Sequence, residues 1–119
     1  MIIKEIIDYS KDSFEADVIV TDGVIECLVF CHPFYGDVGD IVDALLPFDV
    51  KNIMKSLTKE YILKKTNAGY YSYSCVAKVL DHRKCLVLVE SLVIDLSISF
   101  PGWAIDGDYI EFECSRFDI

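Results

Sequence analysis

The stretch from Phe14 to Cys31, FEADVIVTDGVIECLVFC, decides the fold class because apolar and polar residues alternate on both sides of Asp22-Gly23. Alternation with a period of two is typical of strands that bury one face. An Asp-Gly dipeptide between two such runs favours a two-residue hairpin turn. Folding the stretch about this turn puts only apolar side chains opposite one another on one face, in the pairs Val20–Ile25, Val18–Cys27, Ala16–Val29 and Phe14–Cys31. The sequence therefore predicts an antiparallel β hairpin with one core face.

Two of the five cysteines and one of the two histidines lie at the end of this stretch, as Cys27, Cys31 and His32. On one strand the two cysteines are about 13 Å apart, which is too far for both thiolates to bind one zinc ion. His32 points to the opposite face from Cys31, so these neighbours cannot form a thiolate–imidazole pair. An odd number of cysteines also argues against a disulfide framework. We interpret the cysteines as buried apolar thiols and predict no metal site.

The middle of the chain has a helical pattern. A turn-rich connection over 33–40 leads to a predicted strand over 41–48, after which Asp49 is a suitable helix N-cap. Apolar residues then recur at helical spacing opposite a row of lysines: Val50, Ile53, Met54, Leu57 and Tyr61 against Lys51, Lys55 and Lys59. This pattern predicts an amphipathic helix over 49–65. We interpret the lysine row as a solvated helix face, with a phosphate-binding strip as the alternative.

The second half alternates like strands again, over 70–79, 85–89, 92–98 and 109–117. In the last run Ile110, Phe112 and Cys114 point inward, and the position of this strand near the end of the chain makes it a candidate for a sheet edge. The chain is thus predicted to be a single domain, 1–119, that is mainly β (α+β). Its order of strands, one helix and further strands resembles that of an OB-type small barrel. A curled antiparallel sheet packed on the one helix fits the same order.

The charge of the chain limits its partners. Twenty acids face eleven bases, for a net charge of −9, and five of the bases are lysines between residues 51 and 65. Such a surface repels nucleic acid and anionic membranes and would steer a basic partner. No apolar run approaches the roughly 20 residues of a membrane span. Glu5 and Asp8 interrupt the N-terminal stretch where a signal peptide is apolar, so we expect a cytoplasmic protein with no membrane partner.

The sequence carries no phosphate loop, dinucleotide fingerprint, nucleophile elbow or HExxH motif. Within 81–85, DHRKC, a histidine beside an acid suits acid–base chemistry, but we interpret the run as a polar hairpin tip because catalysis needs a pocket. Tyr70, Tyr71 and Tyr73 fit either a base-stacking platform or, as we prefer, packing of the last two with a wet rim at Tyr70. We predict that the protein is not an enzyme and binds no cofactor.

Small size, acidity, a β core and no catalytic motif favour a protein-binding module. In this character the chain resembles the small acidic immunity proteins of bacterial toxin–immunity pairs. That resemblance implies a cytoplasmic inhibitor that binds and neutralises a basic partner, such as a nuclease toxin, by covering its active site. The alternative is an OB-like domain that binds a small molecule or an oligonucleotide without catalysis. The sequence leaves the oligomeric state and the strand order open.

Two acidic patches are the predicted partner-binding surfaces. The first comprises Asp37, Asp40 and Asp43, in a stretch from Gly36 to Asp49 that contains no cation. The second comprises Asp106, Asp108, Glu111 and Glu113. For each patch the alternative interpretation is that the charges only keep the protein in solution.

Overall fold

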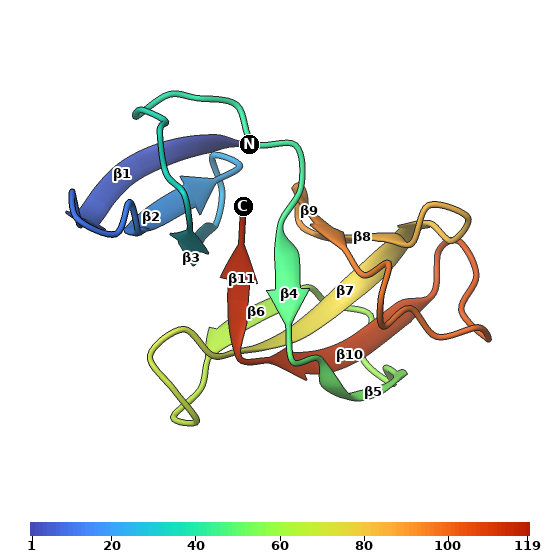
Figure 1. Cartoon of the computed structure of the whole chain (residues 1–119). Coiled ribbons are helices and arrows are strands. Elements are labelled where there is room, and N and C mark those ends of the chain that lie inside the picture. The colour runs from blue at the N-terminus through green and yellow to red at the C-terminus, as the bar shows by residue number, and fades with distance from the viewer.

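Two β sheets contain all the regular structure of the computed structural model, which describes all 119 residues (Figure 1). The strands are β1 (Ile2–Tyr9), β2 (Ala16–Thr21), β3 (Glu26–Cys31), β4 (Leu46–Phe48), β5 (Lys51–Lys55), β6 (Ile62–Lys65), β7 (Tyr73–Asp81), β8 (Leu86–Val89), β9 (Leu92–Asp95), β10 (Tyr109–Cys114) and β11 (Arg116–Asp118). The prediction of a mainly β protein is confirmed. The structure has no helix of the length and apolarity needed to traverse a bilayer.

The first sheet has the order β1-β2-β3-β11-β4, and the second has the order β5-β10-β7-β8-β9 with β6 also paired to β7. All pairs are antiparallel except β11 with β3. In Figure 1 the hairpin strands β1 to β3 lie apart from β7 and β10, and β11 runs from β10 toward β3. The last segment of the chain, β10 followed by β11, therefore passes from the second sheet to the first.

The predicted hairpin forms, but its register is wrong by two residues. Ala16 pairs with Cys31, and Thr21 with Glu26, so the loop has four residues instead of two. The Asp22 carboxylate explains this loop, because its Oδ1 accepts the backbone N–H groups of Val24 and Ile25 at 2.8 and 2.9 Å. A shift of two residues is one full period of a strand, so every side chain within β2 and β3 keeps its predicted face. The predicted core position of Phe14 is wrong, because this residue precedes β2, has a φ of 59° and is 42% exposed.

The predicted helix over 49–65 is wrong: this segment forms β5 and β6. Asp49 and Asn52 have positive φ angles of 54° and 56°, which short polar side chains tolerate but which a helix excludes. The apolar side of the expected helix is not buried as a face, since Leu57 is fully exposed and Met54 is half exposed. The backbone of the segment bonds to neighbouring strands, as when Ser56 N–H donates to the carbonyl of Tyr109 at 2.9 Å.

A bent ribbon of two chain segments joins the sheets. β4 and β5 run antiparallel to β11 and β10, and both segments change sheet at the same place. Ser115 holds this bend, because its N–H donates to the Phe48 carbonyl at 3.0 Å and its Oγ donates to Asp49 Oδ2 at 2.6 Å. The candidate edge over 109–117 is not one, since β10 lies between β5 and β7 and β11 lies between β3 and β4.

The core lies between the two sheets and contains 24 buried residues from both. Ile110, Phe112 and Cys114 are buried, as predicted for the inward face of β10. Neither sheet closes on itself, so the predicted OB-like barrel does not form. The strand expected over 41–48 is regular only in β4, although Leu45 also makes a parallel bridge to Ile94 of β9.

Strand β1 was missed because its apolar residues do not alternate cleanly. The pairing of β1 with β2 shifts register between Ile3 and Glu5, and again between Ile6 and Asp8. Such bulges insert an extra residue and break the period of two.

Tyr73 ties the sheets together, and its replacement should weaken the fold. The residue lies on β7 with 4% of its surface exposed, and its hydroxyl oxygen accepts the N–H of Leu28 on β3 at 2.8 Å. Tyr73→Phe leaves this buried N–H without a partner, which costs about 1–3 kcal/mol of unfolding free energy. Urea unfolding measures the loss. The matched change Tyr70→Phe, at a residue that is 59% exposed, should stay within about 0.5 kcal/mol of wild type; equal effects of the two changes would contradict this role of Tyr73.

Candidate functional site

The first predicted patch lies on the connection between β3 and β4. Asp37, Asp40 and Asp43 are all exposed. Asp40 Oδ2 accepts the N–H of Asp37 at 2.9 Å, which closes the turn between them. Backbone bonds between Ile3 and this turn, Ile3 N–H to the Asp40 carbonyl at 3.0 Å and Gly39 N–H to the Ile3 carbonyl at 2.7 Å, fix it to β1. The carboxylates of Asp37 and Asp43 are thus held at the surface and take no hydrogen bond from the chain.

An apolar hollow of about 430 Å³ adjoins these acids. Its apolar wall includes Ile3, Phe34, Ile41, Val42, Leu46 and Ile119, and Asp40 and Asp43 also line it. Ile41 is 80% exposed and Leu46 is 45% exposed, so these side chains are open to contact. The acids could be predicted from the sequence but the apolar wall could not, because its members come from β1, the connection before β4, β4 itself and the end of the chain.

The second predicted patch is not a free acidic surface. Asp106 binds His82, and Asp108 Oδ2 accepts the N–H of Ile105 at 3.2 Å. Glu113 accepts a hydrogen bond from the side chain of Asn52 at 2.9 Å. Of these four acids, only Glu111 has no hydrogen-bond partner. It lies beside Met54 and Val76, which are its neighbours in the adjacent strands.

Lysines from the segment predicted as a helix lie among these acids. Lys51 stands opposite Glu113 in the pairing of β5 with β10, and Lys55 Nζ is 3.9 Å from Asp108 Oδ1. Lys64 pairs with Ser74, which in turn pairs with Glu113. Lysines thus lie next to two acids of the second patch, Asp108 and Glu113, whereas the stretch from Gly36 to Asp49 contains no cation. At the first patch the structure brings an apolar surface together with acids that form no ion pair.

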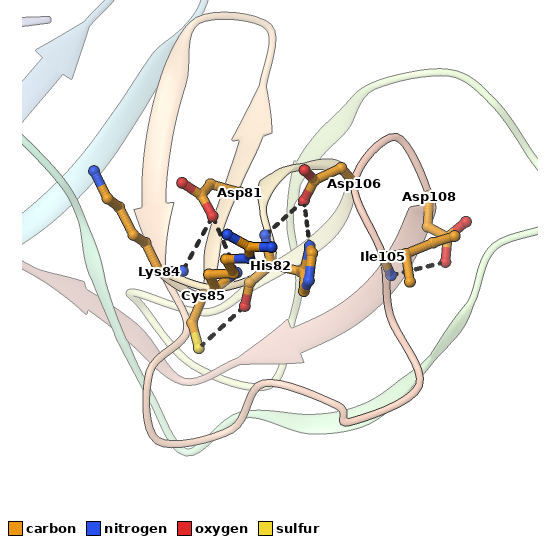
Figure 2. Close-up of polar contacts among 8 residues, drawn as sticks. Asp81, His82, Lys84, Cys85, Ile105, Asp106 and Asp108 are labelled. Carbon is orange, nitrogen blue, oxygen red and sulfur yellow. Dashed lines mark hydrogen bonds and ion pairs between the residues drawn. The ribbon is translucent and has the colours of Figure 1, made fainter.

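The loop over 81–85 is a hairpin turn held by side-chain hydrogen bonds (Figure 2). Asp81 Oδ1 accepts the N–H groups of Arg83 and Lys84 at 3.0 and 3.2 Å. Asp106 Oδ1 accepts the N–H of His82 at 2.8 Å and lies 2.7 Å from its ring Nδ1. The Cys85 thiol points away from this imidazole, toward the His82 carbonyl. The contacts fasten the 105–108 turn to the tip and form no thiolate–imidazole pair.

The contact with His82 should make stability depend on pH. The backbone N–H of His82, followed by its side chain, lowers the pKa of Asp106 from its ordinary value of 3.8. A lowered pKa in the folded state means a stabilising contribution that is present above about pH 4 and lost as the pH falls below it. We therefore expect Asp106→Asn to unfold more easily than wild type at pH 6, with the difference vanishing near pH 2.

Thermal unfolding from pH 6 to pH 2 measures this difference. Asp12→Asn is the matched control, because Asp12 is exposed and accepts no hydrogen bond. A difference between wild type and Asp106→Asn that persists unchanged to pH 2 would contradict the role of the carboxylate charge.

The cysteines divide into two groups. Cys27, Cys75 and Cys114 are buried, whereas Cys31 and Cys85 are partly exposed, and all five are free. The interpretation as buried thiols thus holds for three of them. Burial raises the pKa of Cys27 and Cys114 to about 12 and that of Cys75 well above its ordinary value.

Alkylation should separate these two groups. Because the thiolate is the reactive form, iodoacetamide at pH 8 should label at most Cys31 and Cys85 in the folded protein and all five cysteines in urea. Peptide mass spectrometry identifies the labelled sites. Rapid labelling of Cys75 in the folded protein would show that the core is open.

Tyr70, Tyr71 and Tyr73 lie as the packing interpretation expects, with Tyr70 at the solvent-exposed rim. Tyr71 donates its hydroxyl to Asp17 Oδ1 at 2.6 Å, Tyr73 is buried, and Tyr70 is exposed. A base-stacking platform would have to rely on Tyr70, whose ring already has the Lys65 ammonium 4.8 Å from its centre.

No protein-family model matches the chain, and neither the curated proteins nor the solved structures include a match.

Proposed function

We propose that the chain is a small acidic module that binds a basic protein through the apolar hollow and the acids beside it. The observation that carries the proposal is the juxtaposition of exposed Ile41 and Leu46 with Asp40 and Asp43 in one hollow. Protein interfaces gain most of their binding energy from apolar anchors in pockets surrounded by polar residues. This surface has both parts.

Electrostatics would select the partner. The whole chain carries a net charge of −9, and long-range attraction speeds the approach of a positively charged surface. At contact, the open carboxylates of Asp37 and Asp43 offer ion pairs to lysine or arginine side chains. An acidic partner would be repelled at both stages.

The partner proposed is a basic enzyme such as a nuclease toxin, and the chain acts as its cytoplasmic immunity or inhibitor protein. A nuclease binds phosphates with cations, so an acidic cover competes directly with its substrate. In this proposal the chain itself is not an enzyme and needs no cofactor. The alternative of an OB-like ligand-binding domain has less support, because core side chains fill the space between the sheets and no barrel encloses a site.

Charge reversal tests the proposal. Wild-type protein is used to capture partners from lysate of the source organism at low salt and at about 0.5 M salt, where charges are screened. The captured basic protein is then purified, and its association rate is measured with Asp37→Lys/Asp43→Lys. We expect the rate to fall at least about tenfold for this variant, since steering of charged partners changes rates by that order or more.

Glu5→Lys/Glu60→Lys is the matched control, because it makes the same change in net charge at two exposed residues that do not line the hollow. It should slow association less than the first variant. Equal slowing by the two variants would show that only net charge matters, and recovery of no basic protein at either salt concentration would overturn the proposed function.

A further inference from the structure

A second cleft opens on the other side of β4. Leu45 is the last residue that joins this segment to β9: its N–H donates to the Val93 carbonyl at 2.8 Å, and its carbonyl accepts the N–H of Asp95 at 2.9 Å. Beyond this point the two chain segments separate, and a cleft of about 330 Å³ lies between 46–49 and 95–99. Leu46 lines both this cleft and the apolar hollow.

The walls of the cleft are apolar and accessible. Ile98 is fully exposed and Phe48 is 48% exposed, and both line the cleft with Leu46, Pro47 and Leu96. Along a strand, the backbone N–H and C=O groups of every second residue point to the same side. The backbone groups of Leu45 point toward β9, so those of Pro47 point into the cleft. Because proline has no N–H to donate, this edge of β4 suits an inserted side chain better than an added strand.

Two carboxylates stand in the lining of the cleft with one oxygen each unused. Asp49 Oδ2 accepts the Ser115 hydroxyl, and Asp95 Oδ1 accepts hydrogen bonds from Ser97. The other oxygen of each acid has no hydrogen-bond partner in the chain. No lysine, arginine or histidine occurs from Cys85 to Ser115 or from Gly36 to Asp49, so no cation comes from either segment that forms the cleft.

Arg116 contacts one of these walls and is already paired. Its Nε and Nη2 donate to the two carboxylate oxygens of Asp118 at 2.5 and 2.9 Å. Its guanidinium also lies over the Phe48 ring, 4.9 Å from the ring centre. The ring of Phe48 thus already packs against one cationic group, and the next residue in the chain is the acid Asp49.

We propose that the cleft receives an arginine or lysine side chain of the basic partner. The apolar stem of that side chain packs between Phe48 and Ile98, and its charged end reaches the open oxygens of Asp49 and Asp95. Long cationic side chains commonly bury their stems in this way while the charged group stays in a polar setting. The inference rests on the proposed function and gives the surface around β4 two binding positions, one for an apolar anchor and one for a cationic side chain.

A second copy of the chain is a poorer occupant than a basic protein. Each copy carries a net charge of −9, so two copies repel each other at low ionic strength. Binding of a second copy would depend on protein concentration, which distinguishes it from binding of a basic partner.

Butylguanidinium is the probe, since it reproduces an arginine side chain, and pentanoate is its anionic counterpart with a similar apolar stem. Each is titrated at low salt into ¹⁵N-labelled full-length protein, and amide shifts are followed by NMR. We expect saturable shifts for Leu46, Phe48, Asp49 and residues 95–99 with butylguanidinium and much smaller ones with pentanoate. Equal responses to the two probes, shifts centred on the lysine-bearing β5 and β6, or no saturable shift would overturn the proposal. Cleft shifts that depend on protein concentration without probe would assign the cleft to a second copy and also overturn it.

Three variants refine the assignment. Asp95→Asn keeps an oxygen to accept from Ser97 but removes the charge, and should weaken butylguanidinium binding about threefold, the size typical of an exposed ion pair. Ile98→Ser removes one apolar wall at a fully exposed position and should weaken binding as well. Leu57→Ser, at an equally exposed leucine outside the cleft, should leave binding unchanged. Unaltered binding by both cleft variants would contradict the inference.

The outcomes separate this inference from the proposed function. Binding of butylguanidinium in the cleft, with no basic protein captured from lysate, would retain the site and remove the proposed partner. Capture of a salt-sensitive basic protein, with no probe in the cleft, would retain the function and remove the site.

Discussion

The bend at Asp49 and Ser115 is the constraint on which the rest of the structure depends. At this point two antiparallel chain segments leave one sheet together and enter the other. The Ser115 hydroxyl and N–H hold Asp49 and Phe48 in place, and the positive φ angles of Asp49 and Asn52 turn the chain. Because the ribbon is continuous, the two sheets face each other across one core and cannot move apart without breaking it. Tyr73 adds a second connection from β7 to β3.

The same bend separates the lysines of β5 from the acidic stretch that contains β4. It directs Lys51 and Lys55 onto β5, beside Glu113 and Asp108 of the second acidic patch. It leaves β4 on the other side, in a stretch without cations. The apolar hollow and the cleft both border β4 and share Leu46. Acids and exposed apolar side chains therefore lie together around β4, and the proposed function rests on this arrangement.

The sequence predicted those parts of the fold that depend on local alternation. Strands around Asp22-Gly23 and in the second half follow from a period of two, whereas the loop register depended on hydrogen bonds from the Asp22 side chain, which the pattern does not reveal. The helix prediction failed because spacing at 50–61 matched a helix by chance, while pairing with β10 and β7, distant in sequence, decided the structure. The acids of the first patch could be predicted from charge alone. Their apolar neighbours could not, since Ile3, Ile41 and Ile119 meet only in the fold.

The measurement that tests this account most directly is an NMR assignment of residues 49–65. Backbone ¹³Cα shifts and long-range nuclear Overhauser contacts report whether this segment is strand or helix. We expect strand-type shifts in β5 and β6, with contacts between the backbones of Met54 and Glu111, which are paired in the structure. Continuous helical shifts from residue 50 to residue 64, with no contact to β10, would contradict it. The lysines would then lie elsewhere, and the charge separation around β4 would lose its basis.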